Sequence, residues 1–116
     1  MAKILVEGIK IHAYHGCLKE ESVIGGSYIV DVTLEADLSK PSKSDNLKDT
    51  LDYVTVHEIV KKEMAVPSKL IEHVANRILH KLKKEFPKVL SLEVKVTKLN
   101  PPIPGEVEKV SVVICE

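Results

Sequence analysis

Lys98 lies at an unusual position for a charged side chain. It continues the apolar alternation of residues 92, 94 and 96, so it is in phase with the covered face of a predicted strand, directly before a proline-rich turn. An amine that is partly removed from water there can act as a general base near neutral pH. The alternative is that strand pairing ends at Val96 and that Lys98 reaches out to water. The pattern alone leaves both interpretations open.

Two further residues have chemistry that suits a small-molecule site. Glu72 lies in the first turn of a predicted helix, where backbone amides favour an ionised carboxylate that can accept two parallel N–H bonds from an amidine-like ligand edge. It also fits an ordinary glutamate at a helix N-terminus. Tyr53 lies where a polar segment meets a helix, and its phenol can either donate a proton or serve as an aromatic plug.

The other reactive side chains form no recognisable constellation. Glu21 lies in a glycine-bounded loop, a position typical of a solvated charge, and the glycines at 25 and 26 match no phosphate-binding loop. The histidine spacing fits no metal site, and no HExxH motif occurs. His15 and Cys17 are too close within a turn to favour a thiolate–imidazolium pair. We therefore predict no metal and no cofactor.

Hydrophobic periodicity predicts the elements that must position these residues. Alternation marks four strands, with Gly8 as a candidate bulge in the first, and spacing of three and four residues marks two helices. The segment 38–52 has loop chemistry, Pro67 ends the first helix, and Ser68 is a candidate N-cap for the second. The predicted order is strands 4–14 and 28–36, helices 56–64 and 70–82, and strands 90–97 and 110–114.

The order ββααββ indicates an α+β fold. We expect a four-stranded antiparallel sheet with both amphipathic helices on one face. The other face should be polar and in contact with water; it would carry His12, Asp31, Thr33, Glu35, Glu93, Lys95, Thr97 and Ser111. Because sheet edges in so small a protein are exposed, edge-to-edge association into a barrel is an attractive arrangement.

Composition excludes several classes of protein. The chain of 116 residues fits one domain, residues 1–116, and it carries 17 basic and 17 acidic residues, so nothing favours nucleic acid or an anionic membrane as partner. With 3% aromatic residues and no Trp, base-stacking surfaces are nearly excluded. Two cysteines make no disulfide framework, and no apolar run is long enough for a signal peptide or a membrane span. We expect a cytoplasmic protein.

Three segments together resemble the dihydroneopterin aldolase family of folate biosynthesis. They are YHGCLKEESVIGG at 14–26, SDNLKDTLDY at 44–53 with LIEHVANRI at 70–78, and TKLNPPIPG at 97–105. The likeness covers nearly the whole chain. It implies the tunnelling fold (T-fold), in which ββααββ units join into a barrel of four subunits, and two barrels often stack as an octamer.

The resemblance also implies roles for individual residues. Glu72 matches the glutamate that anchors the 2-amino group and ring N–H of the pterin, and Lys98 matches the base that acts with a bound water. Tyr53 matches a tyrosine that assists protonation from the neighbouring subunit, and Glu21 matches a glutamate that helps to hold the lysine and the water. Further pterin contacts are implied for the hydroxyl of Thr50 and for backbone groups around Leu51 and Ile71.

The sequence departs from the family pattern in three places. Gly26 stands where the family usually has Gln, which affects the rigidity of the loop that bears Glu21. Cys17 replaces a residue that is commonly small and aliphatic, and the stretch 66–69 is shorter by a few residues.

The activity implied by the resemblance is a metal-free retro-aldol cleavage. 7,8-Dihydroneopterin would give 6-hydroxymethyl-7,8-dihydropterin and glycolaldehyde, with 2′-epimerisation as a side activity, in active sites between the subunits of a homo-oligomer. Two alternatives are a dihydroneopterin triphosphate epimerase, which would want a cationic cluster, and a non-catalytic α+β binding module. A related synthase that binds zinc through three histidines is disfavoured by the spacing of the histidines here.

Overall fold

Strict alternation in the second strand organises the protein. The computed structural model describes residues 1–116, and in β2 (Gly26–Ala36) Tyr28, Val30, Val32, Leu34 and Ala36 are all buried, as predicted. β2 lies inside an antiparallel sheet of order β1-β2-β3-β4, between β1 (Ala2–Ala13) and β3 (Ser91–Leu99), with β4 (Lys109–Cys115) at one edge. Gly8 has a φ of 72° where the β1 register shifts, which confirms the predicted bulge.

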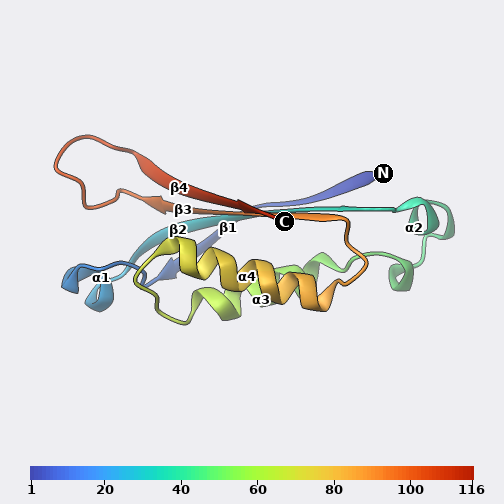
Figure 1. Ribbon diagram of the computed structural model, residues 1–116, viewed down its shortest axis with the longest axis horizontal. Coiled ribbons are helices and arrows are strands. Elements are labelled where there is room, and N and C mark those ends of the chain that lie inside the picture. Colours follow the sequence, from blue (N-terminus) through green and yellow to red (C-terminus); the bar gives the residue numbers. More distant parts are fainter.

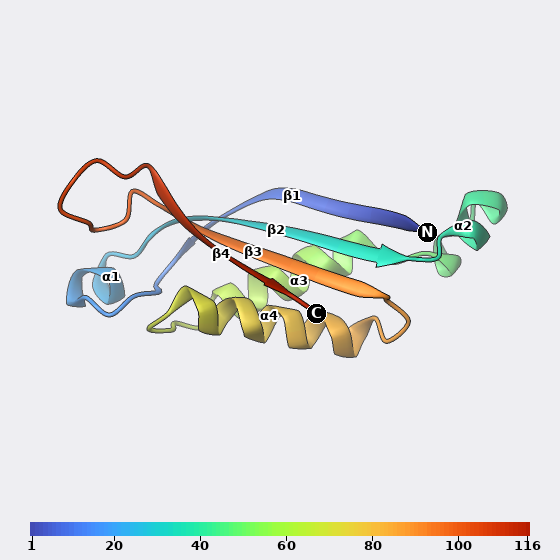
Figure 2. The same cartoon turned by 45° about the horizontal axis from the view of Figure 1, so that its top comes forward.

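Two helices cover one face of the sheet and leave the other open (Figures 1 and 2). α3 (Tyr53–Met64) buries Val56, Val60 and Met64, and α4 (Ile71–Glu85) buries an apolar stripe from Ile71 to Leu82. These side chains meet the apolar face of β2 and β3 in a single core cluster. The predicted α+β architecture, with both helices on one side, is confirmed.

Several local predictions were wrong. The polar segment 38–52 is not only loop, because it forms α2 (Ser39–Ser44) and a 3-10 turn, η1 (Leu47–Asp49). The glycine-bounded loop after β1 likewise contains a short helix, α1 (Lys19–Val23). The N-cap of α4 is Leu70 rather than Ser68, whose side chain is used elsewhere. Helices this short carry too little periodic signal to be recognised from sequence.

Three side chains differ from their predicted exposure. Leu70 and Leu90 are about half exposed, because each lies just outside the element to which its periodicity assigned it. Thr97, on the open polar face, is buried, and its Oγ1 lies 2.7 Å from Oγ of Ser111 on the adjacent strand. This cross-strand hydrogen bond satisfies the hydroxyl that burial would otherwise leave without a partner.

Candidate active site

Lys98 and Glu21 form a sheltered ion pair at the end of β3. Lys98 pairs in register with Tyr28 of β2, and its Nζ donates to Oε2 of Glu21 at 2.6 Å. Each of the two charged side chains is only 16% exposed. Lys98 therefore does not extend into water, and Glu21 is not a solvated loop charge. A pair this short and this sheltered is screened little by solvent.

Gly16 is what allows Glu21 to reach this position. Its φ is +152°, and a Cβ built on it would lie 2.1 Å from Oε1 of Glu21 and 2.5 Å from Oε2. The carboxylate thus packs directly on the glycine backbone, in space that any side chain would fill. Oε1 also accepts a long hydrogen bond, 3.4 Å, from the backbone N–H of Leu18. The α1 segment therefore positions Glu21 through close backbone approach.

A cavity of about 200 Å³ opens beside the ion pair. Its charged groups are Lys98, Glu21 and the neighbouring Glu20, so its net charge is negative when all three are ionised. Tyr28 forms part of the wall, and burial raises the pKa of its phenol above the usual 10. The complete lining is Glu20, Glu21, Ile24, Gly25, Gly26, Tyr28, Lys98, Leu99, Asn100 and Pro102.

Glu72 and Ile71 lie at the same end of the molecule as this cavity. α4 is followed by a short connection, residues 86–90, after which β3 runs back in the opposite direction. The start of α4 therefore lies where β3 finishes, as Figures 1 and 2 show. Ile71 is buried, whereas Glu72 is exposed in the first turn, where the helix N-terminus favours its negative charge.

Thr50, Leu51 and Tyr53 lie at the opposite end. Tyr53 is the first residue of α3, whose 12 residues run for about 18 Å before the chain turns back into α4. Figure 1 shows this start of α3 close to α2, far from α1. Tyr53 is 64% exposed, and Asp52 caps the helix by accepting from the Val54 N–H at 2.9 Å. One chain thus places Glu21, Lys98, Ile71 and Glu72 at one end of the molecule, with Lys98 and Glu21 in direct contact, and the other three predicted residues at the opposite end.

His15 is a central residue that sequence reasoning did not identify. It is completely buried, and its Nδ1 accepts from the Ser68 backbone N–H at 3.1 Å. Burial, together with the positive charge of Arg77, lowers the pKa of His15 from 6.5 to about 4. Cys17, by contrast, is exposed and its thiol donates to the Lys69 carbonyl, so His15 and Cys17 do not form a catalytic pair. Because His15 lies in a turn, no hydrophobic periodicity in the sequence indicated that it would be buried.

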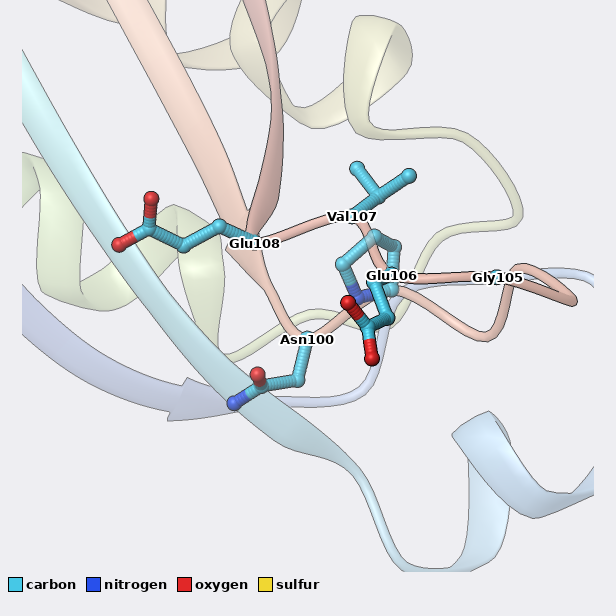
Figure 3. Close-up of a pocket in the computed structure, with 6 residues that line it drawn as sticks. Asn100, Gly105, Glu106, Val107 and Glu108 are labelled. Carbon is cyan, nitrogen blue, oxygen red and sulfur yellow. The ribbon is translucent and has the colours of Figure 1, made fainter.

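A second hollow lies in the β3–β4 hairpin. It has a volume of about 480 Å³ and is lined by Asn100, Pro101, Gly105, Glu106, Val107 and Glu108. In Figure 3 the carboxylates of Glu106 and Glu108 point in different directions and do not converge. None of the predicted site residues lines this hollow, so the chemistry belongs with the cavity at Lys98. Nowhere in the chain do three or more His, Cys, Asp or Glu side chains group in a way that could hold a metal ion.

Comparison with known proteins decides the family. The family model described as "FolB: Dihydroneopterin aldolase" matches residues 4–115. A dihydroneopterin aldolase of Staphylococcus epidermidis is 41% identical over 112 residues, which cover 96% of this chain and 93% of that protein. This chain belongs to the dihydroneopterin aldolase family. It is thus a lyase of folate biosynthesis, and the alternative of a non-catalytic binding module is wrong.

Solved structures of dihydroneopterin aldolases share the fold. A putative dihydroneopterin aldolase from Vibrio cholerae superposes with a TM-score of 0.91 at 26% identity, covering all of this chain and 97% of that one. The E. coli dihydroneopterin aldolase in complex with neopterin also gives 0.91, at 23% identity, covering 100% and 99%. The predicted T-fold is confirmed. None of the helices has the length and apolar run that crossing a membrane requires.

Proposed function

We propose that this protein cleaves 7,8-dihydroneopterin by a retro-aldol reaction in which Lys98 is the base. The observation that supports the proposal is the sheltered pair of Lys98 and Glu21 at 2.6 Å, beside a cavity at the end of β3. A base must be held within hydrogen-bond reach of its proton, directly or through one water. Here the side chain of Glu21 holds the amine of Lys98 at the cavity wall.

The reaction begins with the hydroxyl on C2′ of the substrate side chain. In the proposed reaction Lys98, with Glu21 as its partner, takes the hydroxyl proton through a water molecule, the C1′–C2′ bond breaks, and glycolaldehyde leaves. The bonding electrons pass to C1′ and into the C=N bond of the pterin ring. Transfer of a proton back to C1′, assisted by the phenol of Tyr53, gives 6-hydroxymethyl-7,8-dihydropterin. Because the ring accepts the electrons, the step needs neither a lysine Schiff base nor a metal.

Glu72 is the proposed anchor for the pterin ring. Its carboxylate is free of ion pairs with side chains and lies in the first turn of α4. Two carboxylate oxygens match the parallel N–H groups on the 2-amino edge of a pterin, the geometry that also makes arginine–carboxylate forks specific. Backbone groups around Ile71, at the same helix terminus, are a proposed further contact for the pterin. The neopterin bound to the E. coli enzyme supports a pterin as ligand of this fold.

We infer that a neighbouring subunit completes the site with Thr50, Leu51 and Tyr53. These residues lie at the opposite end of the chain from Lys98, so one subunit alone cannot place Tyr53 at the reacting carbon. The sheet has two edges, at β1 and β4, whose outward backbone groups are available for pairing with another copy. Pairing at these edges into a barrel of four subunits, alone or stacked as an octamer, would bring opposite ends of adjacent chains together.

The charges at the cavity favour an unphosphorylated substrate. Glu20 and Glu21 outnumber Lys98 there, and the only arginine of the chain, Arg77, donates instead to the carbonyls of Glu63 and Val66. A triphosphate would require a cluster of cations. The triphosphate epimerase alternative is therefore disfavoured. Epimerisation at C2′ to dihydromonapterin remains a natural side reaction, because the aldehyde can add back to either face before it leaves.

The proposal is tested by chromatography of the anaerobic products from 7,8-dihydroneopterin in the presence of a chelator. We expect hydroxymethyldihydropterin and glycolaldehyde in equal amounts. Dihydromonapterin as the sole product would make the protein an epimerase, and unchanged substrate would refute the proposed activity. A borohydride-trapped adduct on Lys98 would show a Schiff base and overturn its role as a base.

Mixing two inactive variants tests the shared site. Lys98→Ala and Tyr53→Phe are dissociated, combined and reassociated. If each site takes Lys98 from one subunit and Tyr53 from the next, about a quarter of the sites in a random mixture carry both native residues. Recovery to about that fraction of wild-type activity is expected. No recovery, with oligomers shown to exchange subunits, would place both residues in one chain's site.

A further inference from the structure

The buried imidazole of His15 links the loop between β1 and α1 to the loop between α3 and α4, which is far away in the sequence. Its Nδ1 accepts from the Ser68 N–H at 3.1 Å and lies 2.8 Å from Ser68 Oγ, while the Ser68 carbonyl accepts from the Gly16 N–H at 2.9 Å. Because a backbone N–H can only donate, Nδ1 is the unprotonated nitrogen and the ring is neutral. The other ring nitrogen, Nε2, has no partner with good hydrogen-bond geometry, although the backbone of Met64 lies near the ring and favours its protonated form, so the well-formed hydrogen bonds of the ring are those to Ser68.

Each of the three neighbours of His15 leads to a residue of the proposed site. On one side, Gly16 follows it and packs against the carboxylate of Glu21. On the second side, Ser68 Oγ lies 3.0 Å from the carbonyl of Leu70, the N-cap of the helix that carries Glu72, and its single proton can be donated either to that carbonyl or to Nδ1 of His15.

The third neighbour is Tyr28, which lies beneath Lys98. The Tyr28 hydroxyl donates to the backbone carbonyl of His15 at 2.6 Å, and the two rings meet edge to face at 5.2 Å. Nζ of Lys98 lies 5.9 Å from the centroid of the Tyr28 ring. His15 is therefore a buried polar residue with three relevant neighbours. Tyr28 lies next to Lys98, and Gly16 lies next to Glu21. Ser68 lies next to the N-cap of the helix that carries Glu72.

We propose that His15 is a positioning residue that sets the separation between the pterin anchor Glu72 and the Lys98–Glu21 pair. The inference rests on the proposed function. An anchor on α4 and a base on β3 must act on one rigid substrate, and a misplacement of about 1 Å between them can cost about 10²-fold in rate. The imidazole acts through Ser68 and needs no contact with the substrate.

Three variants separate positioning from simple packing. In His15→Asn the side-chain oxygen can occupy the place of Nδ1 and accept from the Ser68 N–H. In His15→Gln the amide extends to the place of Nε2 instead. His15→Leu fills the space without a hydrogen-bond acceptor. For the folded oligomer we expect His15→Asn to keep kcat within about fivefold. His15→Leu and His15→Gln should lose about 10- to 100-fold in kcat. Affinity for hydroxymethyldihydropterin, read from pterin fluorescence, should change much less.

The outcomes distinguish the two roles. Thermal melting and size-exclusion chromatography of each variant give the folded fraction, to which the rates are normalised. A residue that only packs the interior would lower the melting temperature while leaving the normalised kcat unchanged, and that result would overturn the proposal. Equal impairment of His15→Asn and His15→Gln would also overturn it, and this comparison stands even if His15→Leu does not fold. An inactive wild-type protein would instead refute the proposed function.

Discussion

Replacing Gly16 by Ala tests whether the Lys98–Glu21 pair drives the reaction. The added Cβ would lie 2.1 Å from Oε1 of Glu21, whereas ordinary contact begins at 3.4 Å, so the carboxylate must retreat by roughly 1.3 Å. Its hydrogen bond to Lys98 is only 2.6 Å long and does not survive such a shift without rearrangement. Displacing a catalytic group by about 1 Å costs about 10²-fold, so we expect kcat to fall by that factor.

The assay is steady-state cleavage of dihydroneopterin, combined with product binding by fluorescence. Gly105→Ala is the matched control, because its φ of +146° brings similar backbone strain while a Cβ there meets nothing within 4 Å, and we expect nearly unchanged kinetics. The φ of +152° at Gly16 adds backbone strain of about 1–3 kcal/mol, so Gly16→Ala should also melt at a lower temperature. Rates are therefore normalised to folded protein.

A double-mutant cycle with Glu21→Ala isolates the cause. If the Gly16→Ala substitution acts by displacing the carboxylate, the double variant should be no slower than Glu21→Ala alone. Additive losses would mean that Gly16 matters for another reason, such as its hydrogen bond to Ser68. Wild-type kcat in Gly16→Ala, at full folding, would refute the assignment of the pair to the reaction.

Three further predictions concern the base, the anchor and the buried histidine. Lys98→Ala should lose about 10²- to 10⁴-fold in kcat with near-normal ligand binding, and equal loss of both would recast Lys98 as a binding residue. Glu72→Ala should weaken pterin binding about 10- to 100-fold in fluorescence titrations, and unchanged affinity would contradict the anchor role. The pKa of His15 is 6.5 in the unfolded chain and about 4 in the folded protein, so as the pH falls the unfolded chain takes up the proton at a higher pH than the folded one. The free energy of unfolding should therefore decrease as the pH falls from about 6.5 to 4. Urea unfolding at fixed protein concentration should show wild type losing up to about 3 kcal/mol more than His15→Asn over this range, and parallel curves would contradict it.

Sequence periodicity predicted the elements that are long and half buried. The alternation of β2 and the stripe of α4 are confirmed because each follows from a single periodic face packed against the core. α1 and α2 escaped prediction because neither buries a residue, so no period marks them. Ser68 was wrongly taken as an N-cap, since its hydroxyl contacts Nδ1 of His15 and the Leu70 carbonyl and accepts from no backbone N–H of α4.

Sequence patterns predicted less of the candidate site than of the fold. Lys98 was singled out because a charged residue continues the apolar alternation of its strand. The same pattern also allowed its side chain to extend into water. Glu21 lies 77 positions away in the sequence, and nothing local indicated that the two would meet at 2.6 Å. The family resemblance supplied the roles of Glu72 and Tyr53.

The sequence by itself therefore determined the α+β order, the face of each long element that is buried, and the family. Those properties depend on local spacing and on motifs that can be read along the chain. Only the tertiary structure decided that Glu21 is paired with Lys98, that His15 joins two distant loops, and that Tyr53 lies at the other end from the base. Contacts between loops depend on how the sheet and helices pack in three dimensions, and hydrogen bonds of single side chains leave no periodic trace in the sequence.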